Sequence, residues 1–185
     1  MSNALSRDFY ARPTLTVARD LLGAILCHRR GDAVLKARIV EVEAYISERD
    51  QACHARAGRT ARTAVMYGPP GHAYVYLVYG MHEMLNVVTE REGSPAAVLV
   101  RGAVRLGGEP LPGPGRLTRA LGIDRALDAV DLCSDRLWIE AGGLGRGERI
   151  ARSPRIGIDY AGSPWVEKPW RLYVEGSVGV SRPRA

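Results

Sequence analysis

One stretch of the sequence decides the fold, and it reads AVLKARIVEVEAY over residues 33–45. Aliphatic and β-branched residues run through it without a glycine or a proline, which favours a long β-strand. Successive side chains of a strand point to opposite faces. One face therefore carries Val34, Lys36, Arg38, Val40, Val42 and Ala44, and the other carries Ile39, Glu41, Glu43 and Tyr45. The second face is either a solvated surface, the favoured interpretation for an isolated strand, or a site that uses two carboxylates.

The flanking sequence predicts more strands that pair with this one. They are expected at residues 24–28, 73–79, 81–89, 96–104, 137–140, 149–151 and 171–174. A polar turn at residues 30–32 separates the first of them from the strand 33–45, and Gly80 separates residues 73–79 from 81–89. Because glycine tolerates the positive φ of a tight turn, each of these two pairs predicts a β-hairpin.

Two short helices complete the predicted fold. The first begins at a cap formed by Thr14 or Thr16 and ends at Gly23, and the second spans residues 116–121 and ends at Gly122. No linker or repeat divides the chain. The sequence therefore predicts an α+β protein, a single compact domain over residues 1–185 with a curved, largely antiparallel β-sheet and flanking short helices.

The composition excludes several classes of protein. With 46% hydrophobic and 25% charged residues, the chain has enough apolar surface to fold. It contains no apolar run of the length that a membrane helix needs, and its first twelve residues lack the apolar core of a signal peptide. We therefore expect no membrane association and a cytoplasmic location, close to the nucleoid if the source is bacterial.

The cysteines and histidines do not predict a metal centre. Cys27, Cys53 and Cys133 form no CxxC pair, and the four histidines lack the i, i+4 spacing of a helical metal pair. We expect neither a metal nor a cofactor.

The charged residues favour a polyanionic partner. The net charge is 26 − 20 = +6, and 24 of the 26 basic residues are arginines. A guanidinium group matches phosphate oxygens with two parallel donors, although codon bias explains the arginine excess equally well. Five of the eight tyrosines, Tyr45, Tyr67, Tyr74, Tyr76 and Tyr79, cluster in the centre of the chain. The residues that flank this cluster are basic: Arg49, Arg56, Arg59, Arg62, Arg101, Arg105, Arg116 and Arg119. Aromatic rings interleaved with guanidinium groups are typical of a nucleic-acid surface.

Three blocks of sequence identify a family resemblance. They are RIVEVEAY at residues 38–45, HARAGRT at 54–60 and GPPGHAYVYLVYGM at 68–81, and Asn86 follows them. Together with later blocks at residues 98–101, 113–117, 155–158 and 168–174, they closely resemble the alkyladenine (3-methyladenine) DNA glycosylase family. The resemblance implies a monofunctional, monomeric DNA glycosylase of base excision repair. Such an enzyme excises alkylated or deaminated purines, among them 3-methyladenine, 7-methylguanine and hypoxanthine, from double-stranded DNA.

The resemblance also implies a role for each matching residue. Glu43 corresponds to the general base that activates water, and Arg101 and the main chain of Ile156 help to hold that water. The flipped base lies in a pocket between Tyr45 and His54 on one wall and Tyr76 on the other, with Asn86 at its edge. Tyr79 is the wedge that enters the DNA, and Met81 and His82 contact the minor groove. His82 and Thr63 depart from the family pattern, in which tyrosine and asparagine are common, and we expect both to alter contacts to the duplex.

The two lysines argue against strand cleavage. A β-elimination requires an amine nucleophile, and Lys36 lies on the face opposite Glu43, whereas Lys168 has no predictable place. Simple hydrolysis that leaves an abasic site is therefore favoured. Two alternatives remain, a catalytically silent nucleic-acid binding domain and an RNA-directed hydrolase.

Overall fold

A computed structural model describes residues 4–181, so the predicted domain of residues 1–185 extends at both ends beyond the described residues. Its strands form one nine-stranded sheet in which every pair of neighbouring strands is antiparallel. The strands are β1 (Ile25–Arg30), β2 (Ala33–Ile46), β3 (Ala73–Val78), β4 (His82–Val88), β5 (Ala96–Arg105), β6 (Pro110–Pro112), β7 (Leu137–Glu140), β8 (Ile150–Ser153) and β9 (Arg171–Val174).

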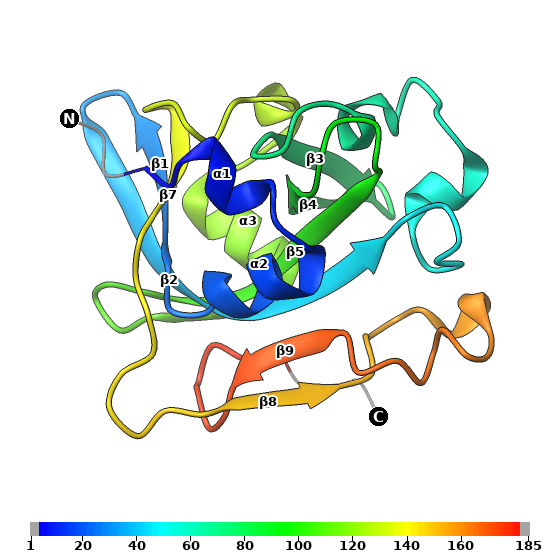
Figure 1. The fold of residues 1–185 in the computed structure, drawn as a ribbon. Helices are drawn as coiled ribbons and strands as arrows, with labels where there is room; N and C mark the ends of the chain where they lie inside the picture. Colours follow the sequence, from blue (N-terminus) through cyan, green and yellow to red (C-terminus); the bar gives the residue numbers. More distant parts are fainter. Residues whose placement is uncertain (1–3, 182–185) are drawn as a thin grey trace.

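The helices are short and pack on the sheet (Figure 1). They are α1 (Arg7–Tyr10), α2 (Thr14–Leu21) and α3 (Pro114–Leu121), with 3₁₀ turns at His54–Ala57, Ala64–Tyr67, Arg125–Leu127 and Asp159–Ala161. Helix α2 contacts β2 and β5, and α3 contacts β4, β5 and β6. The predicted α+β class with a curved antiparallel sheet is confirmed. No helix within residues 4–181 has the length and apolarity needed to cross a membrane.

Strand β2 is the centre of the sheet. The main path runs β3-β4-β5-β2-β1-β7, so β5 covers one edge of β2. Along the other edge, β1 pairs with the first half of β2, and β9 pairs with residues Glu41 to Glu43 in the second half. Both edges of β2 are therefore paired where the two carboxylates lie, and Glu41 and Glu43 are completely buried. The interpretation of this face as a solvated surface is wrong, because long-range pairing and loops cover it.

An irregular pairing between β2 and β5 changes the alternation that the sequence predicts. Ile39 pairs with Ala103 and Glu41 with Gly102, which leaves Val40 as an extra residue. Val42 then pairs with Val100, which leaves Arg101 as an extra residue on β5. As a consequence Ile39 lies in the main hydrophobic core with Val40 instead of sharing the face of the carboxylates. Bulges of this kind re-aim side chains beside functional sites.

The sequence predicted the glycines of the turns correctly, but it did not predict the residue that caps α2. Gly31, Gly80 and Gly122 all have positive φ at the turns and the helix end where the sequence placed them. The cap of α2 is Pro13 rather than Thr14 or Thr16, and it makes no side-chain cap bond. Thr14 instead bonds Thr89 (3.0 Å) and Glu90 (2.5 Å). The hydrogen bonds of Thr14 to Thr89 and Glu90, which are distant in sequence, thus replace a local helix cap.

Candidate active site

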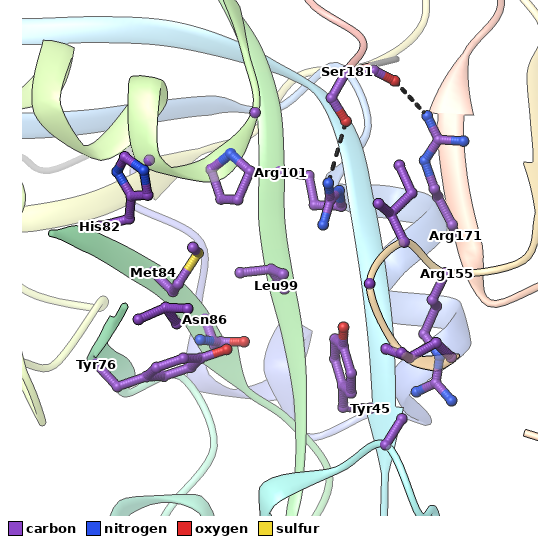
Figure 2. Close-up of a pocket in the computed structure, with 18 of the residues that line it drawn as sticks. Tyr45, Tyr76, His82, Met84, Asn86, Leu99, Arg101, Arg155, Arg171 and Ser181 are labelled. Carbon is purple, nitrogen blue, oxygen red and sulfur yellow. Dashed lines mark hydrogen bonds between the residues drawn. The ribbon is translucent and has the colours of Figure 1, made fainter. Parts of the chain in front are cut away.

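A large cavity of about 1740 Å³ opens where β2, β3, β4 and β5 meet the start of α3 and the loops at residues 52–66, 154–160 and 178–181. Figure 2 shows Tyr45 and Tyr76 on its two sides, with Leu99 between them and Asn86 beside Tyr76. Nine of the ten predicted site residues line this cavity: Tyr45, His54, Tyr76, Tyr79, Met81, His82, Asn86, Arg101 and Ile156. The tenth, Glu43, is completely buried and is hydrogen bonded to three of the lining residues.

Glu43 is held by three donors that themselves line the cavity. The Tyr45 hydroxyl donates to Glu43 Oε2 at 2.8 Å, and Arg101 Nη1 donates to the same oxygen at 3.3 Å. The backbone N–H of Ile156 donates to Oε1 at 2.7 Å. Three hydrogen bonds to one carboxylate fix its direction within the fold. Glu43 is therefore a buried carboxylate of fixed direction next to three residues that line the cavity.

Glu41 differs from Glu43 in its partners, because its four hydrogen bonds come from Arg171, Arg101 and Ser181. Arg171 Nε donates to Oε1 at 2.6 Å, and Arg101 Nε donates to it at 3.3 Å. The Ser181 hydroxyl (2.7 Å) and backbone N–H (2.6 Å) complete the set. Arg171 also donates to the Ser181 carbonyl at 2.8 Å, as Figure 2 shows. Glu41 thus fastens β9 and the segment before the C-terminus to β2 and orients Arg101 toward Glu43.

The position of Arg101 corrects one element of the predicted basic surface. The side chain is 11% exposed and bridges the two buried carboxylates, so it does not belong to the surface that would meet a polyanion. Arg105 is also engaged, with Glu109 and with the carbonyl of Ala120. Arg62, Arg116 and Arg119 do line the cavity.

Tyrosine and histidine rings form one side of the cavity. The centroids of Tyr74 and Tyr76 lie 5.0 Å apart, and the His54 ring meets Tyr76 edge-on at 4.6 Å. The Tyr74 hydroxyl is hydrogen bonded to His54 Nδ1 at 2.9 Å. Tyr74 is almost fully buried, so it supports Tyr76 and His54 from behind. His54 contacts Tyr76, the ring that was expected on the opposite wall.

Burial changes the titration of these rings. It raises the pKa of Tyr45 well above its usual value, with the charge of Glu43 acting in the same direction, so Tyr45 remains a hydrogen-bond donor. Burial, together with Arg62 and Arg56, lowers the pKa of His54 from 6.5 to about 4. His54 is therefore neutral at neutral pH.

The lowered pKa of His54 makes stability depend on pH. Between pH 6.5 and about 4 the unfolded chain binds a proton at this residue that the folded chain does not bind. The free energy of unfolding should therefore fall as the pH drops through this window, and His54→Gln should lose less stability over the same range. Urea unfolding of both proteins at pH 7, 5.5 and 4 measures this. A constant difference between the two would contradict the assignment.

The hairpin between β3 and β4 presents Tyr79 to solvent. Tyr79 and Gly80 both have positive φ, of 52° and 68°, and Met81 N–H donates to the Val78 carbonyl at 3.2 Å, which defines a type I′ turn. A bulky residue in the left-handed region is strained, and such strain is found at functional positions. The Tyr79 ring is 88% exposed. The turn therefore holds an aromatic ring outward at the cavity mouth.

Three other predicted residues occupy distinct surroundings. Asn86 is buried and its amide donates to the Tyr74 carbonyl at 3.1 Å. Met81 is exposed, whereas His82 is half-buried against α3, where a Cβ at Gly115 would come within 2.9 Å of its Nδ1. Thr63 is buried and its hydroxyl donates to the Gly58 carbonyl at 2.9 Å, so it shapes the loop from inside instead of facing outward.

Neither lysine lines the cavity. Lys36 pairs with Glu140 at 2.9 Å, and Lys168 Nζ lies 4.8 Å and 4.7 Å from the ring centroids of Trp165 and Trp170. Residues 4–181 contain no group of three or more histidine, cysteine or acidic side chains that could hold a metal ion.

Sequence reasoning gave no role to several residues that complete the site. Arg155 and Asp50 form an ion pair with both side chains fully buried, and Tyr160, 60% exposed, borders the cavity. Arg171 and Ser181 hold Glu41. No local spacing could reveal these contacts, because the partners are separated by 105 to 140 residues.

Comparison with known proteins agrees with this geometry. The family model described as "Methylpurine-DNA glycosylase (MPG)" matches residues 8–178. A relative from Methanocella arvoryzae is 48% identical over 194 residues, covering 96% of this chain and 96% of the relative. A relative from Myxococcus xanthus is 50% identical over 184 residues, covering 97% and 94%. Both carry the name "Putative 3-methyladenine DNA glycosylase". With a family match and relatives that extend over nearly the whole chain, this protein belongs to the methylpurine-DNA glycosylase family.

Proposed function

We propose that this protein rotates an alkylated or deaminated purine out of duplex DNA and hydrolyses its N-glycosidic bond with a water activated by Glu43. Its family makes it a DNA-3-methyladenine glycosylase of DNA repair, a hydrolase that acts on N-glycosyl bonds. Base flipping and water activation are proposed from one observation. The buried Glu43 carboxylate is oriented by Tyr45, Arg101 and Ile156, three residues that line an aromatic cavity.

The chemistry requires a carboxylate in this position. Departure of a purine leaves an oxocarbenium-like sugar, and a nearby carboxylate stabilises that positive charge and accepts a proton from the attacking water. We take this water to be held by Glu43, the Arg101 guanidinium and the main chain of Ile156, since Arg101 and Ile156 both already contact the Glu43 carboxylate. The products are the free base and an abasic site.

The cavity walls suit a flipped purine. Tyr45 and Tyr76 offer ring faces on the two sides, and a cationic alkylated base stacks favourably on electron-rich rings. A cationic base also leaves without an acid. His54 is neutral at neutral pH, so it does not serve as a cationic acid for a neutral lesion such as hypoxanthine. We therefore expect cationic purines to be excised faster than neutral ones.

The mouth of the cavity suits a DNA surface. Six large hydrophobic side chains are exposed within residues 4–181, and four of them, Tyr79, Met81, Tyr160 and Val178, border this one cavity. Exposed apolar side chains gathered in this way mark an interaction surface, and the net charge of +6 favours a phosphate backbone. Because residues of one chain form the whole arrangement, we propose that the protein acts as a monomer.

A base-release assay tests the proposal. The protein is incubated with duplexes that contain 3-methyladenine, 7-methylguanine or hypoxanthine, and with matched undamaged DNA and RNA duplexes, and the released base is measured by chromatography. We expect base release from damaged DNA with an intact strand. Binding without release on every lesion would support a silent binding domain, and release from RNA alone would support an RNA-directed hydrolase.

Tyr79→Ser tests the wedge. The ring fills the gap that the flipped nucleotide leaves, so its loss should weaken capture of a lesion in duplex DNA roughly tenfold, the equivalent of about 1.4 kcal/mol. Excision from a single-stranded substrate should change much less, because no stack must be opened. Leu106→Ser is the matched control, since Leu106 is 61% exposed but lies outside the cavity. An unchanged duplex affinity in Tyr79→Ser would count against the wedge.

A further inference from the structure

Arg155 sits in the most completely enclosed ion pair of the described chain. Its Nη1 donates to Asp50 Oδ2 at 2.6 Å and its Nη2 donates to Asp50 Oδ1 at 2.9 Å, and both side chains have zero exposure. Asp50 is itself fixed, because it accepts from the backbone N–H groups of Ile46 (3.2 Å) and Ala52 (3.1 Å). The pair therefore joins the loop after β8 to the loop after β2 at one defined point.

The same guanidinium also reaches the strand that carries Glu43. Arg155 Nη1 donates to the carbonyl of Ala44 at 2.9 Å, and Ala44 stands between Glu43 and Tyr45. The residue after Arg155 is Ile156, whose N–H donates to Glu43 Oε1 at 2.7 Å. The Arg155 side chain thus joins the two backbone segments that meet in this contact, the β2 segment that carries Glu43 and the loop that carries Ile156.

Arg155 further supports the aromatic wall. Its guanidinium carbon lies 4.7 Å from the Tyr45 ring centroid and 5.0 Å from that of Trp170. In Figure 2 Arg155 lies on the side of Tyr45 that faces away from Tyr76. The Tyr45 ring is therefore backed by a buried planar cation, which leaves its other face for the cavity.

We propose that Arg155 is a positioning residue for base excision, which sets the distance between Glu43 and the main chain of Ile156 and fixes the plane of the Tyr45 ring. This proposal rests on the proposed function, because it assigns Arg155 to the same carboxylate and the same wall. Arg155 itself touches neither the water nor the sugar. It acts on the reaction through Ile156 and Tyr45.

The chemistry of arginine is specific for this arrangement. The planar fork binds both Asp50 oxygens and the Ala44 carbonyl at once while its face stacks on Tyr45, and an ammonium group cannot do both. A displacement of about 1 Å at a reacting group can lower a rate a hundredfold. Arg155→Lys therefore keeps a positive charge beside Asp50. It loses the simultaneous bonds to Asp50 and Ala44 that hold the Ile156 loop, and it loses the stacking that holds the Tyr45 ring.

The experiment measures single-turnover excision of 7-methylguanine from a duplex at increasing protein concentration. For Arg155→Lys we expect the maximal rate to fall ten- to a hundredfold, while the protein concentration at half-saturation stays within threefold of wild type, because Tyr79 and the exposed arginines are unchanged. Arg152→Lys is the matched control, since Arg152 is exposed in the same segment. Thermal unfolding verifies that each variant is folded.

A second variant covers the case in which Arg155→Lys does not fold. The double variant Arg155→Gln with Asp50→Asn removes both charges, so neither remains buried without a partner. It should be folded and show the same loss of maximal rate. The positioning role would be overturned by a folded variant that excises the base within twofold of the wild-type maximal rate. It would also be overturned if the maximal rate and the half-saturating concentration changed in proportion to the unfolded fraction of the variant. Failure of the wild-type protein to release any base would instead refute the proposed function, and this inference with it.

Discussion

Glu43→Gln is expected to lower the rate of base excision by a factor on the order of 10² or more. Glutamine keeps the shape of the side chain, but its amide neither accepts a proton from water nor stabilises a positively charged sugar. Arg101 keeps a partner in the variant because it also bonds Glu41 at 3.3 Å, so no cation is left buried alone. Single-turnover excision of 3-methyladenine and 7-methylguanine from duplex DNA measures the loss.

The affinity for lesion-containing DNA should stay near the wild-type value in Glu43→Gln. Glu43 is completely buried, so it contributes little to the surface that meets the duplex. Glu109→Gln is the control, because it makes the same chemical change on a carboxylate whose side chain is 63% exposed and lies outside the cavity. Equal excision by wild type and Glu43→Gln would remove Glu43 from its role as the base.

Glu41→Gln is expected to have the largest effect on stability. The substitution leaves the cationic Arg171, whose side chain is only 6% exposed, without its carboxylate partner. Breaking a buried ion pair from one side typically costs about 3 to 5 kcal/mol. For a chain of this size, that cost corresponds to a fall of roughly 10 °C in the melting temperature. Thermal unfolding and urea titration both measure it.

A double-mutant cycle separates the ion pair from simple packing. Replacing Arg171 by Met together with Glu41→Gln removes the charge that would otherwise be stranded, so we expect part of the stability to return. Glu109→Gln, which alters the exposed pair with Arg105, should change the free energy of unfolding by less than about 1 kcal/mol. A loss in Glu41→Gln no greater than that of Glu109→Gln would show that the Glu41 network contributes little.

Local sequence patterns predicted most of the strands correctly. The strand at 137–140 is Leu137–Glu140 and the strand at 171–174 is Arg171–Val174, and the other six predicted strands lie within three residues of the observed ends. This success follows from physics that acts between neighbours, namely side-chain alternation, the conformational freedom of glycine and the restriction of φ by proline. The strand Pro110–Pro112 and helix Arg7–Tyr10 were missed, because each is too short to show a period.

The errors arose where distant segments override local preference. The Glu41 and Glu43 face was favoured as solvated, yet β9 and two loops bury it. Thr14 bonds Thr89 and Glu90 in place of capping α2. Arg101 was counted with a basic surface, although a bulge turns it inward toward two carboxylates.

The sequence alone determined the long strand that carries Glu43 and Tyr45, the turn that presents Tyr79, and the resemblance that assigned their roles. Only the tertiary structure decided that Ile156 would bond Glu43 from 113 positions away, and that Asp50 and Arg155 would fasten that contact across 105. The physical reason is that backbone propensities depend on a few adjacent residues, whereas the direction of a buried carboxylate depends on whichever donors the folded chain brings to it. Those donors are neighbours of the carboxylate only in the folded chain.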